Sequence, residues 1–172
     1  MSLKELTTDK HRAAESTKFM RSVFDGTITL DTWADWTLQK TLIYSAIEKQ
    51  AKTAGLLDDM PDLERTLKLL TDYRAMVGDE VKHDFKDATV LYQQYLLSLP
   101  ANKIMAHLYT WHMGDLFGGQ MIKRVVQAPH SSLDFNNAPE LISTIRTKLS
   151  DDMAPEVRTA FDWAIKILES YE

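Results

Sequence analysis

Residues that break regular structure are scarce in this chain, and this scarcity constrains its fold more than any other feature. Its 172 residues include only six glycines and five prolines, about half the usual share of roughly 12%. A β-sandwich or β-barrel needs many tight turns, and such turns consume both residue types. Apolar residues instead recur at intervals of three and four along most of the sequence, which indicates amphipathic helices. The sequence therefore predicts an all-α fold.

Composition narrows the class of protein further. The chain has no cysteine, which excludes disulfide frameworks, cysteine-ligated zinc, iron–sulfur clusters and cysteine nucleophiles. A net charge of −5 leaves no basic excess for binding nucleic acid. No apolar run reaches the ~20 residues that span a bilayer, and the polar amino-terminal residues do not resemble a signal peptide. We therefore expect one domain over residues 1–172, monomeric and cytoplasmic, with no membrane or nucleic-acid partner.

Helical periodicity and boundary residues divide the chain into a succession of helices. Asp31 is the expected cap of the second helix, and Gly55 is expected to end it. Residues 131–137 read as a loop and residues 24–27 as a turn, with no internal repeat or interdomain linker. The expected helices span residues 2–20, 30–54, 62–76, 85–99, 102–127, 140–149 and 155–171. This order predicts a single helical bundle.

Half of the glycines lie within six residues of the longest expected helix. Gly114, Gly118 and Gly119 each cost about 1 kcal/mol relative to alanine in a helix interior. Gly114 and Gly118 are four residues apart and share one helix face, where the missing Cβ atoms let a flat or bulky group approach the backbone. A close helix–helix crossing, or a break between two helices, is the alternative explanation. The neighbouring Asp115, which looks buried, favours a ligand site over packing.

Four of the five histidines give no clear functional signal. His107 and His112 are five residues apart and do not share a helix face, so they do not form a zinc pair. His83 has the Glu-x-x-His spacing of di-iron bundles, but those sites need a second copy of the motif. We therefore expect His83 to face solvent, and we expect His130, which follows a proline in the loop, to be exposed.

His11 differs from the other histidines in its neighbours. It has small alanines beside it and Glu15 one turn further along the expected helix. A carboxylate at this spacing can orient a ligating imidazole. On its own, however, a histidine near an amino terminus is most often an ordinary surface residue.

Two segments together resemble the signatures of a known family. Residues 3–15, LKELTTDKHRAAE, followed by Phe19 and Met20, are similar to the proximal-helix signature of haem oxygenases. Residues 106–120, AHLYTWHMGDLFGGQ, are similar to their distal-helix signature, and Tyr44-x-x-x-Glu48 also matches. The resemblance extends over nearly the whole chain. It is closer to the compact, anchor-free enzymes of cyanobacteria and their phages than to the membrane-anchored animal enzymes.

The resemblance implies an all-α bundle of the haem oxygenase type, with haem between the two signature helices as both cofactor and substrate. It implies that His11 is the axial iron ligand and that Glu15 is turned towards it. It also implies that Gly114 and Gly118 let the distal backbone approach the porphyrin, which would account for the cost of these glycines.

The resemblance also assigns polar residues on the distal side. Asp115 corresponds to an aspartate that holds an ordered water close to the iron, and Tyr44 and Tyr92 would support that water network. The implied reaction is O₂-dependent cleavage of haem at the α-meso carbon, giving biliverdin IXα, carbon monoxide and ferrous iron. In such a reaction the protein supplies orientation, protons and the exclusion of side reactions.

Residues at the edge of the haem are implied as well. Lys4 and Arg146 match residues that bind the haem propionates, and Tyr109 belongs to the same cofactor-binding set. The chain departs from the family pattern at three positions: Ile142 stands where a second propionate-binding lysine is common, Trp111 where a distal arginine is common, and Phe117 where a small polar residue is usual. These departures bear on which meso carbon is attacked and how fast.

The chain carries no flavin or nicotinamide motif, so another protein must supply the electrons. The resemblance implies reduced ferredoxin, an acidic protein that would dock on a local basic patch. Lys10, Arg12, Lys123 and Arg124 flank the two signature helices and are the candidates, unless they are simply solvated charges. A bilin reductase that receives the product is a further candidate partner.

Two other functions fit parts of the sequence. A non-catalytic haem carrier on the same fold would keep His11 and the glycines but could dispense with the distal water network. Asp115 favours the enzyme over such a carrier. An all-α interaction module without a cofactor would leave the glycine cluster to packing alone.

Overall fold

Helices form all of the regular structure, and no strand is present, which confirms the all-α prediction. The computed structural model describes residues 1–172. No helix combines the length and apolar content that a membrane crossing requires. The α-helices are α1 Leu3–Glu15, α2 Lys18–Phe24, α3 Leu30–Thr53, α4 Thr66–Val77, α5 Asp87–Leu97, α6 Ala101–Leu108, α7 Gly114–Val125, α8 Ala138–Thr147 and α9 Ala154–Glu169. Short 3₁₀ turns are η1 Pro61–Leu63, η3 Ser131–Leu133 and η4 Asp151–Met153.

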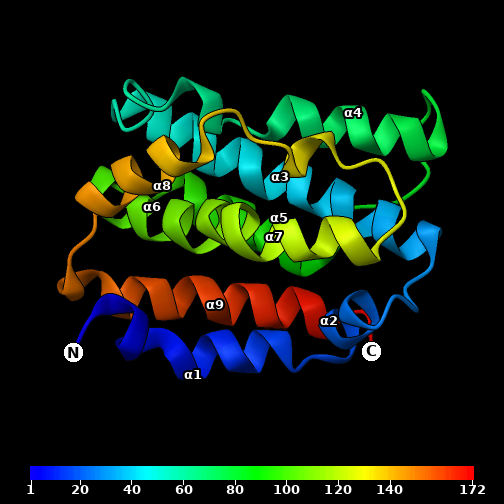
Figure 1. Cartoon of the computed structure of the whole chain (residues 1–172), viewed down its shortest axis with the longest axis horizontal. Coiled ribbons are helices and arrows are strands. Elements are labelled where there is room, and N and C mark those ends of the chain that lie inside the picture. The colour runs from blue at the N-terminus through cyan, green and yellow to red at the C-terminus, as the bar shows by residue number, and fades with distance from the viewer.

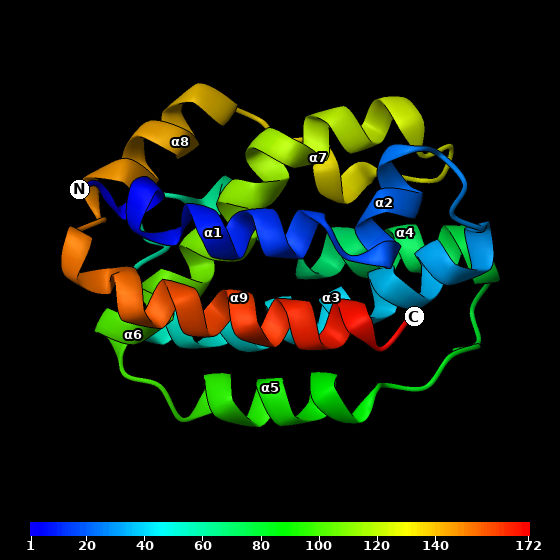
Figure 2. The same ribbon diagram turned by 90° about the horizontal axis from the view of Figure 1, so that it is seen from below.

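The long helix α3 runs through the middle of the molecule (Figure 1). Helix α4 packs along one side of it, and α5 and α6 also pack against it. Helices α1 and α9 lie side by side at the opposite edge from α4 (Figure 1). Viewed from that edge, α1 crosses between α7 and α9 (Figure 2). Residues of the two segments that carried the resemblance, α1 and the region around α7, line one cleft.

The helix starts differ from the prediction in three places. The helix expected over residues 62–76 begins only at Thr66, after the separate turn η1. The expected helix over residues 2–20 is broken after Glu15, because the Thr17 hydroxyl caps a new helix by accepting a hydrogen bond from the Met20 amide at 3.3 Å. Helix α3 is capped by Thr29, whose hydroxyl accepts from the Thr32 amide at 3.1 Å, and the predicted cap Asp31 lies in the first turn instead. Threonine hydroxyls compete with the helical backbone in this way because they reach nearby amides.

The longest expected helix, over residues 102–127, is interrupted by a π-helical turn. This turn, Tyr109–Met113, joins α6 to α7, so that Gly114 opens the second helix. A π-turn inserts extra backbone into a helix and rotates the faces on either side relative to each other. Such turns are frequent at functional sites. The residue pattern alone did not indicate this insertion.

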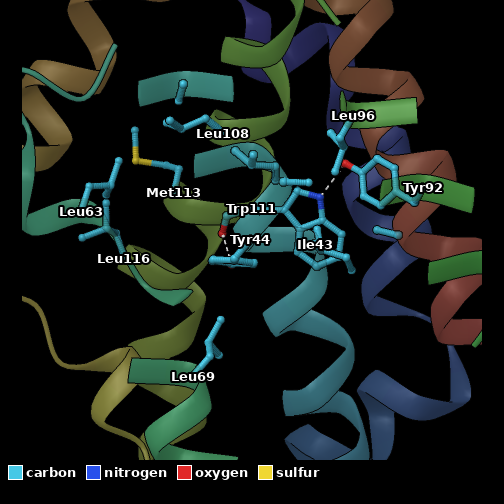
Figure 3. Close-up of a cluster of buried hydrophobic side chains, with 14 of the residues drawn as sticks. Ile43, Tyr44, Leu63, Leu69, Tyr92, Leu96, Leu108, Trp111, Met113 and Leu116 are labelled. Atoms are coloured by element: carbon cyan, nitrogen blue, oxygen red, sulfur yellow. Dashed lines mark hydrogen bonds between the residues drawn. The ribbon is translucent and has the colours of Figure 1, made fainter. Parts of the chain in front are cut away.

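The main core lies where α3 meets α5, the π-turn and α9. Tyr44 and Tyr92 are fully buried, and the Trp111 ring lies between them, with ring centroids 6.0 and 6.1 Å away. Figure 3 shows this group, with Trp111 hydrogen-bonded to both tyrosines. The core therefore contains a series of hydrogen-bonded aromatic side chains as well as aliphatic packing.

A charged contact ties α1 to α9 at the edge of the molecule. The Arg158 guanidinium donates to both carboxylate oxygens of Asp9, at 2.7 and 2.9 Å, and to the carbonyl of Leu6 at 3.0 Å. Hydrogen bonding from Arg158 lowers the pKa of Asp9 to about 2. A carboxyl whose pKa is lower in the folded than in the unfolded chain stabilises the fold above its unfolded pKa, and this stabilisation disappears as the pH falls.

We therefore expect Asp9→Asn to lower the free energy of unfolding at pH 7 and to have a much smaller effect at pH 2. The difference from the parent should shrink as the pH falls from about 4, the unfolded pKa, to about 2, the folded value. Urea unfolding at a series of pH values measures it. In an Arg158→Gln background, Asp9→Asn should have no pH-dependent effect, and a persistent dependence there would show that another group is responsible.

Candidate functional site

A cleft opens between α1 and α2 on one side and α3, α7 and α9 on the other. It holds about 900 Å³, its open mouth included. Most of its lining is apolar, and an apolar cleft with a few converging polar groups is the usual form of a ligand site. The large apolar side chains of its wall include Met20, Trp33, Trp36, Ile122, Phe161 and Leu168.

His11 projects from α1 into this cleft. Its side chain is 57% exposed, and its Nε2 lies 3.4 Å from Glu15 Oε1. The edge of its ring meets Phe161 on α9, with centroids 5.9 Å apart. One ring nitrogen thus faces a carboxylate, which leaves the other for a ligand in the cleft.

The glycine cluster serves two purposes. Gly114 and Gly118 line the cleft, and a Cβ added at either would meet nothing within 4 Å. Gly119 faces the protein instead, because a Cβ there would lie 2.8 Å from Leu133 Cδ2. Open space explains the first two glycines, whereas close packing, which the sequence offered as the alternative, explains the third.

Asp115 is almost fully buried at the inner end of the cleft, and both of its carboxylate oxygens have partners. Lys40 Nζ lies 3.0 Å from Oδ1, and the Tyr44 hydroxyl lies 2.6 Å from Oδ2. The Tyr44 hydroxyl is also 3.1 Å from the carbonyl of Trp111. Burial and the neighbouring Asp115 charge raise the pKa of Tyr44 well above its ordinary value. Tyr44 therefore keeps its proton at neutral pH, and its hydroxyl donates a hydrogen bond to the carboxylate.

Tyr92 is separated from Asp115 by the Trp111 side chain. The Trp111 indole donates to the Tyr92 hydroxyl at 2.9 Å (Figure 3). That hydroxyl lies 2.6 Å from His107 Nδ1. His107 Nε2 in turn lies 2.9 Å from Glu156, which also accepts from Tyr95. Burial lowers the pKa of His107, although the Glu156 hydrogen bond opposes this shift. Tyr92 does not line the cleft itself. It contacts Trp111, which belongs to the wall that the π-turn and α7 form, and we call this wall the distal wall.

Helix α3 presents a polar stripe to the distal segment, with residues four apart in the sequence. Lys40 and Tyr44 bind Asp115, and Glu48 accepts from His112 Nε2 at 2.8 Å. Burial alone would raise the pKa of Glu48, but hydrogen bonds, first among them that from His112, outweigh it and hold this pKa below its usual value. The sequence pattern singled out Tyr44 and Glu48 but not Lys40. Polar residues at this spacing on an otherwise buried helix were the signal that could have found it.

The residues predicted to contact the edge of a ligand lie outside the cleft lining. Lys4 is exposed on α1, and Arg146 is exposed on α8 with its guanidinium 5.9 Å from the Phe117 ring centroid. Tyr109 is partly buried in the π-turn, where burial raises its pKa and the charge of Arg146 opposes this. Phe117, which stands where the family usually has a small polar residue, is 52% exposed and does not line the cleft. Ile142 packs against the core.

The basic residues expected to form a patch are only partly free. Lys10 pairs with Asp162 at 2.6 Å, and Lys123 pairs with Asp134 at 2.8 Å. Arg12 and Arg124 are exposed. Two of the four positive charges are therefore offset by acidic neighbours.

His83 does not face solvent, so the expectation for it was wrong. Only 12% of its side chain is exposed, because the segment after α4 folds back over Tyr73 and the start of α3. Its Nδ1 lies 2.9 Å from the Tyr73 hydroxyl and its Nε2 lies 2.9 Å from Asp31. His130 is exposed as expected.

Comparisons with known proteins agree on one family. A family model described as "Heme oxygenase" matches residues 1–148. Over 162 residues the chain is 27% identical to the heme oxygenase of Guillardia theta, covering 88% of this chain and 67% of that protein. It is 31% identical to heme oxygenase 2 of Oryctolagus cuniculus over 137 residues, 73% of this chain and 44% of the rabbit protein. The chain thus spans less than half the length of the rabbit relative.

Two solved structures have closely similar folds. Heme oxygenase from Leptospira interrogans superimposes with a TM-score of 0.88 at 24% identity, covering 99% of this chain and 100% of that one. Heme oxygenase-1 from the cyanobacterium Synechocystis, solved in complex with heme, gives a TM-score of 0.86 at 21% identity, covering 99% and 90%. At these identities the match concerns the fold.

Proposed function

The chain belongs to the haem oxygenase family, and we propose from this premise that it binds haem in the cleft between α1 and α7 and cleaves it with O₂. One observation carries the proposal. His11 lies on one side of the cleft, while Gly114, Gly118 and Asp115 lie on the same cleft's other side. An imidazole opposite a bare backbone surface is the arrangement that a flat, iron-containing ligand needs.

The residues present fit such a group. The open space in front of Gly114 and Gly118 accepts a planar molecule against the backbone. The wall around it is largely aromatic and aliphatic, as suits an apolar macrocycle. His11 is a nitrogen donor with an exposed ring and a carboxylate beside it, which is the usual surrounding of a ligating histidine.

The protein's own groups have distinct tasks in this proposal. Bound haem supplies the iron that activates O₂ and the porphyrin that is cleaved. His11 binds the iron, and Glu15 fixes the orientation of the imidazole. Asp115 holds an ordered water at the inner end of the cleft, and Tyr44 donates a hydrogen bond that keeps the carboxylate in place. Tyr92 acts through Trp111, whose indole it holds.

Residues outside the lining have the task of binding the haem carboxylates. We assign it to Lys4 and Arg146, which are exposed cations on α1 and α8. We also assign it to Tyr109, which is close enough to Arg146 for the guanidinium charge to oppose the rise in its pKa that burial causes. Cleavage at the α-meso carbon, which yields biliverdin IXα, carbon monoxide and ferrous iron, is the expected outcome. Reduced ferredoxin is the expected electron donor, and a bilin reductase is a candidate recipient of the product.

Absorption spectroscopy tests the function directly. The purified protein is mixed with one equivalent of haem, and ferredoxin, its reductase and NADPH are then added in air. Loss of the Soret band with growth of the broad red band of biliverdin supports the proposal, and chromatography of the product gives the isomer. A Soret band that forms but persists under reduction would instead favour a haem carrier. No spectral shift on adding haem would show that His11 is not a ligand.

Charge reversal tests the proposed ferredoxin surface. We expect Lys123→Glu with Arg124→Glu to slow ferredoxin-driven turnover severalfold at low salt, because an acidic partner loses two attractive charges. Haem affinity should be unchanged within twofold. Steady-state rates at several salt concentrations measure the effect.

Two variants control for non-specific effects of charge. Arg124→Glu alone avoids disturbing the pair between Lys123 and Asp134. Reversal of Lys68 and Arg74, which are exposed on α4, changes the net charge by the same amount at a different place. Docking at α7 would be contradicted if the α4 reversal slowed turnover equally. It would also be contradicted if Lys123→Glu with Arg124→Glu left the rate unchanged.

A further inference from the structure

A buried lysine that the reaction scheme above does not use lies at the inner end of the cleft. Lys40 is only 8% exposed and is the one lysine or arginine among the lining residues. Lysines are almost never buried without a counter-charge, because removing the ammonium group from water is expensive. Its position therefore requires an explanation beyond packing.

Lys40 and Tyr44 both contact the Asp115 carboxylate. Its Nζ lies 3.0 Å from Asp115 Oδ1 and 5.1 Å from the centroid of the Tyr44 ring. Lys40 and Tyr44 are one helical turn apart on α3, so they approach the same carboxylate from the same face. Lys40 takes one oxygen and Tyr44 takes the other. Asp115 is thereby fixed in rotation by two contacts from one rigid helix.

We propose that Lys40 is a positioning residue of the cleft, which fixes the orientation of the Asp115 carboxylate and places a positive charge beside the cleft. The alternative is a purely structural ion pair. Buried pairs of that kind add little net stability, since their attraction barely exceeds the cost of burying both charges. Removing one partner of a purely structural pair would lower the free energy of unfolding, because the other charge would stay buried alone, but it would not change the affinity of the cleft for anions.

The first experiment uses the haem-free protein and is independent of the proposed function. Asp115→Asn should lower Tm by about 5–10 °C, because it leaves the Lys40 charge buried without its partner. In a Lys40→Met background the same substitution should lower Tm by less than half as much. Lys49→Met, an exposed lysine on the same helix, provides the control and should not change the effect of Asp115→Asn. If Asp115→Asn and Lys40→Met lowered Tm additively, the proposed pairing of Lys40 with Asp115 would be overturned.

The second experiment separates positioning from structure, and it rests on the proposed function. Fluoride binding to the ferric haem complex is titrated by absorption spectroscopy in the parent, Lys40→Met, Lys40→Arg and Lys49→Met proteins. At an effective dielectric constant of about 20, one unit charge changes an anion's affinity tenfold out to about 12 Å. Lys40→Met should therefore weaken fluoride binding about tenfold, Lys40→Arg should restore most of it, and Lys49→Met should have no effect.

The two experiments fail in different ways. Unchanged fluoride affinity in Lys40→Met, with haem affinity intact, would leave only a structural ion pair and overturn the inference. Failure of the parent protein to bind haem would overturn the proposed function instead, and the haem-free comparison would then decide whether Lys40 and Asp115 are coupled.

Discussion

Replacing His11 with alanine is expected to abolish turnover and to weaken haem binding by at least about a hundredfold, while the haem-free protein stays folded. The stability should be unchanged because the His11 side chain is mostly exposed and its polar contact, to Glu15, is long at 3.4 Å. Such surface contacts contribute little to the free energy of unfolding. Loss of an axial ligand, by contrast, removes the bond that fixes the iron in the cleft.

Other histidines are not positioned to replace His11. His107 and His112 are fully buried and engaged with Glu156 and Glu48. Haem titrations, followed by the Soret band, and turnover with the reducing system measure the effect. Added imidazole should restore part of the parent spectrum, since it can occupy the space left by the side chain. His130→Ala, which removes an exposed histidine, is the control and should behave as the parent does.

A haem complex of the His11→Ala protein with the parent spectrum would show that the ligand lies elsewhere. The cleft contains no second histidine. That outcome would therefore move the haem site away from this cleft and overturn the proposed arrangement of α1 against α7.

The second large effect is expected from adding bulk at Gly118. Gly118→Leu should block haem binding, because the new side chain would project into the open cleft. The haem-free protein should nevertheless be as stable as the parent or more so, since leucine is favoured over glycine in a helix by up to about 1 kcal/mol. Opposite changes in stability and affinity would identify this glycine as functional.

The adjacent glycine supplies a matched comparison. Gly119→Ala would place its Cβ 2.8 Å from Leu133, a buried residue of the η3 turn. We expect a lower Tm, because Leu133 must shift within a close-packed interior, while haem affinity changes less than in Gly118→Leu. Thermal unfolding and haem titration of both variants measure the two effects. Tight haem binding by Gly118→Leu would show that the ligand does not lie against α7.

The amino-acid sequence determined the helical architecture, and the resemblance it carries predicted several residues that line the cleft, among them His11, Gly114 and Asp115. Helix formation depends on neighbours three and four residues apart, so the apolar spacing and the scarcity of breakers were sufficient to predict the all-α fold. The glycine pair was informative for the same reason, because Gly114 and Gly118 share a face on any helix. The association of His11 with Asp115, from segments far apart in the chain, came from resemblance and not from local spacing.

Tertiary structure alone decided the features that depend on distant partners. The π-turn before Gly114 arises from a backbone adjustment that residue spacing does not encode. Lys40 resembles an ordinary helix lysine until α7 brings Asp115 to within 3.0 Å of it. The energy of a charge depends on its surroundings. Whether a charged residue lies in solvent or at the centre of a site is therefore settled only when the helices pack together.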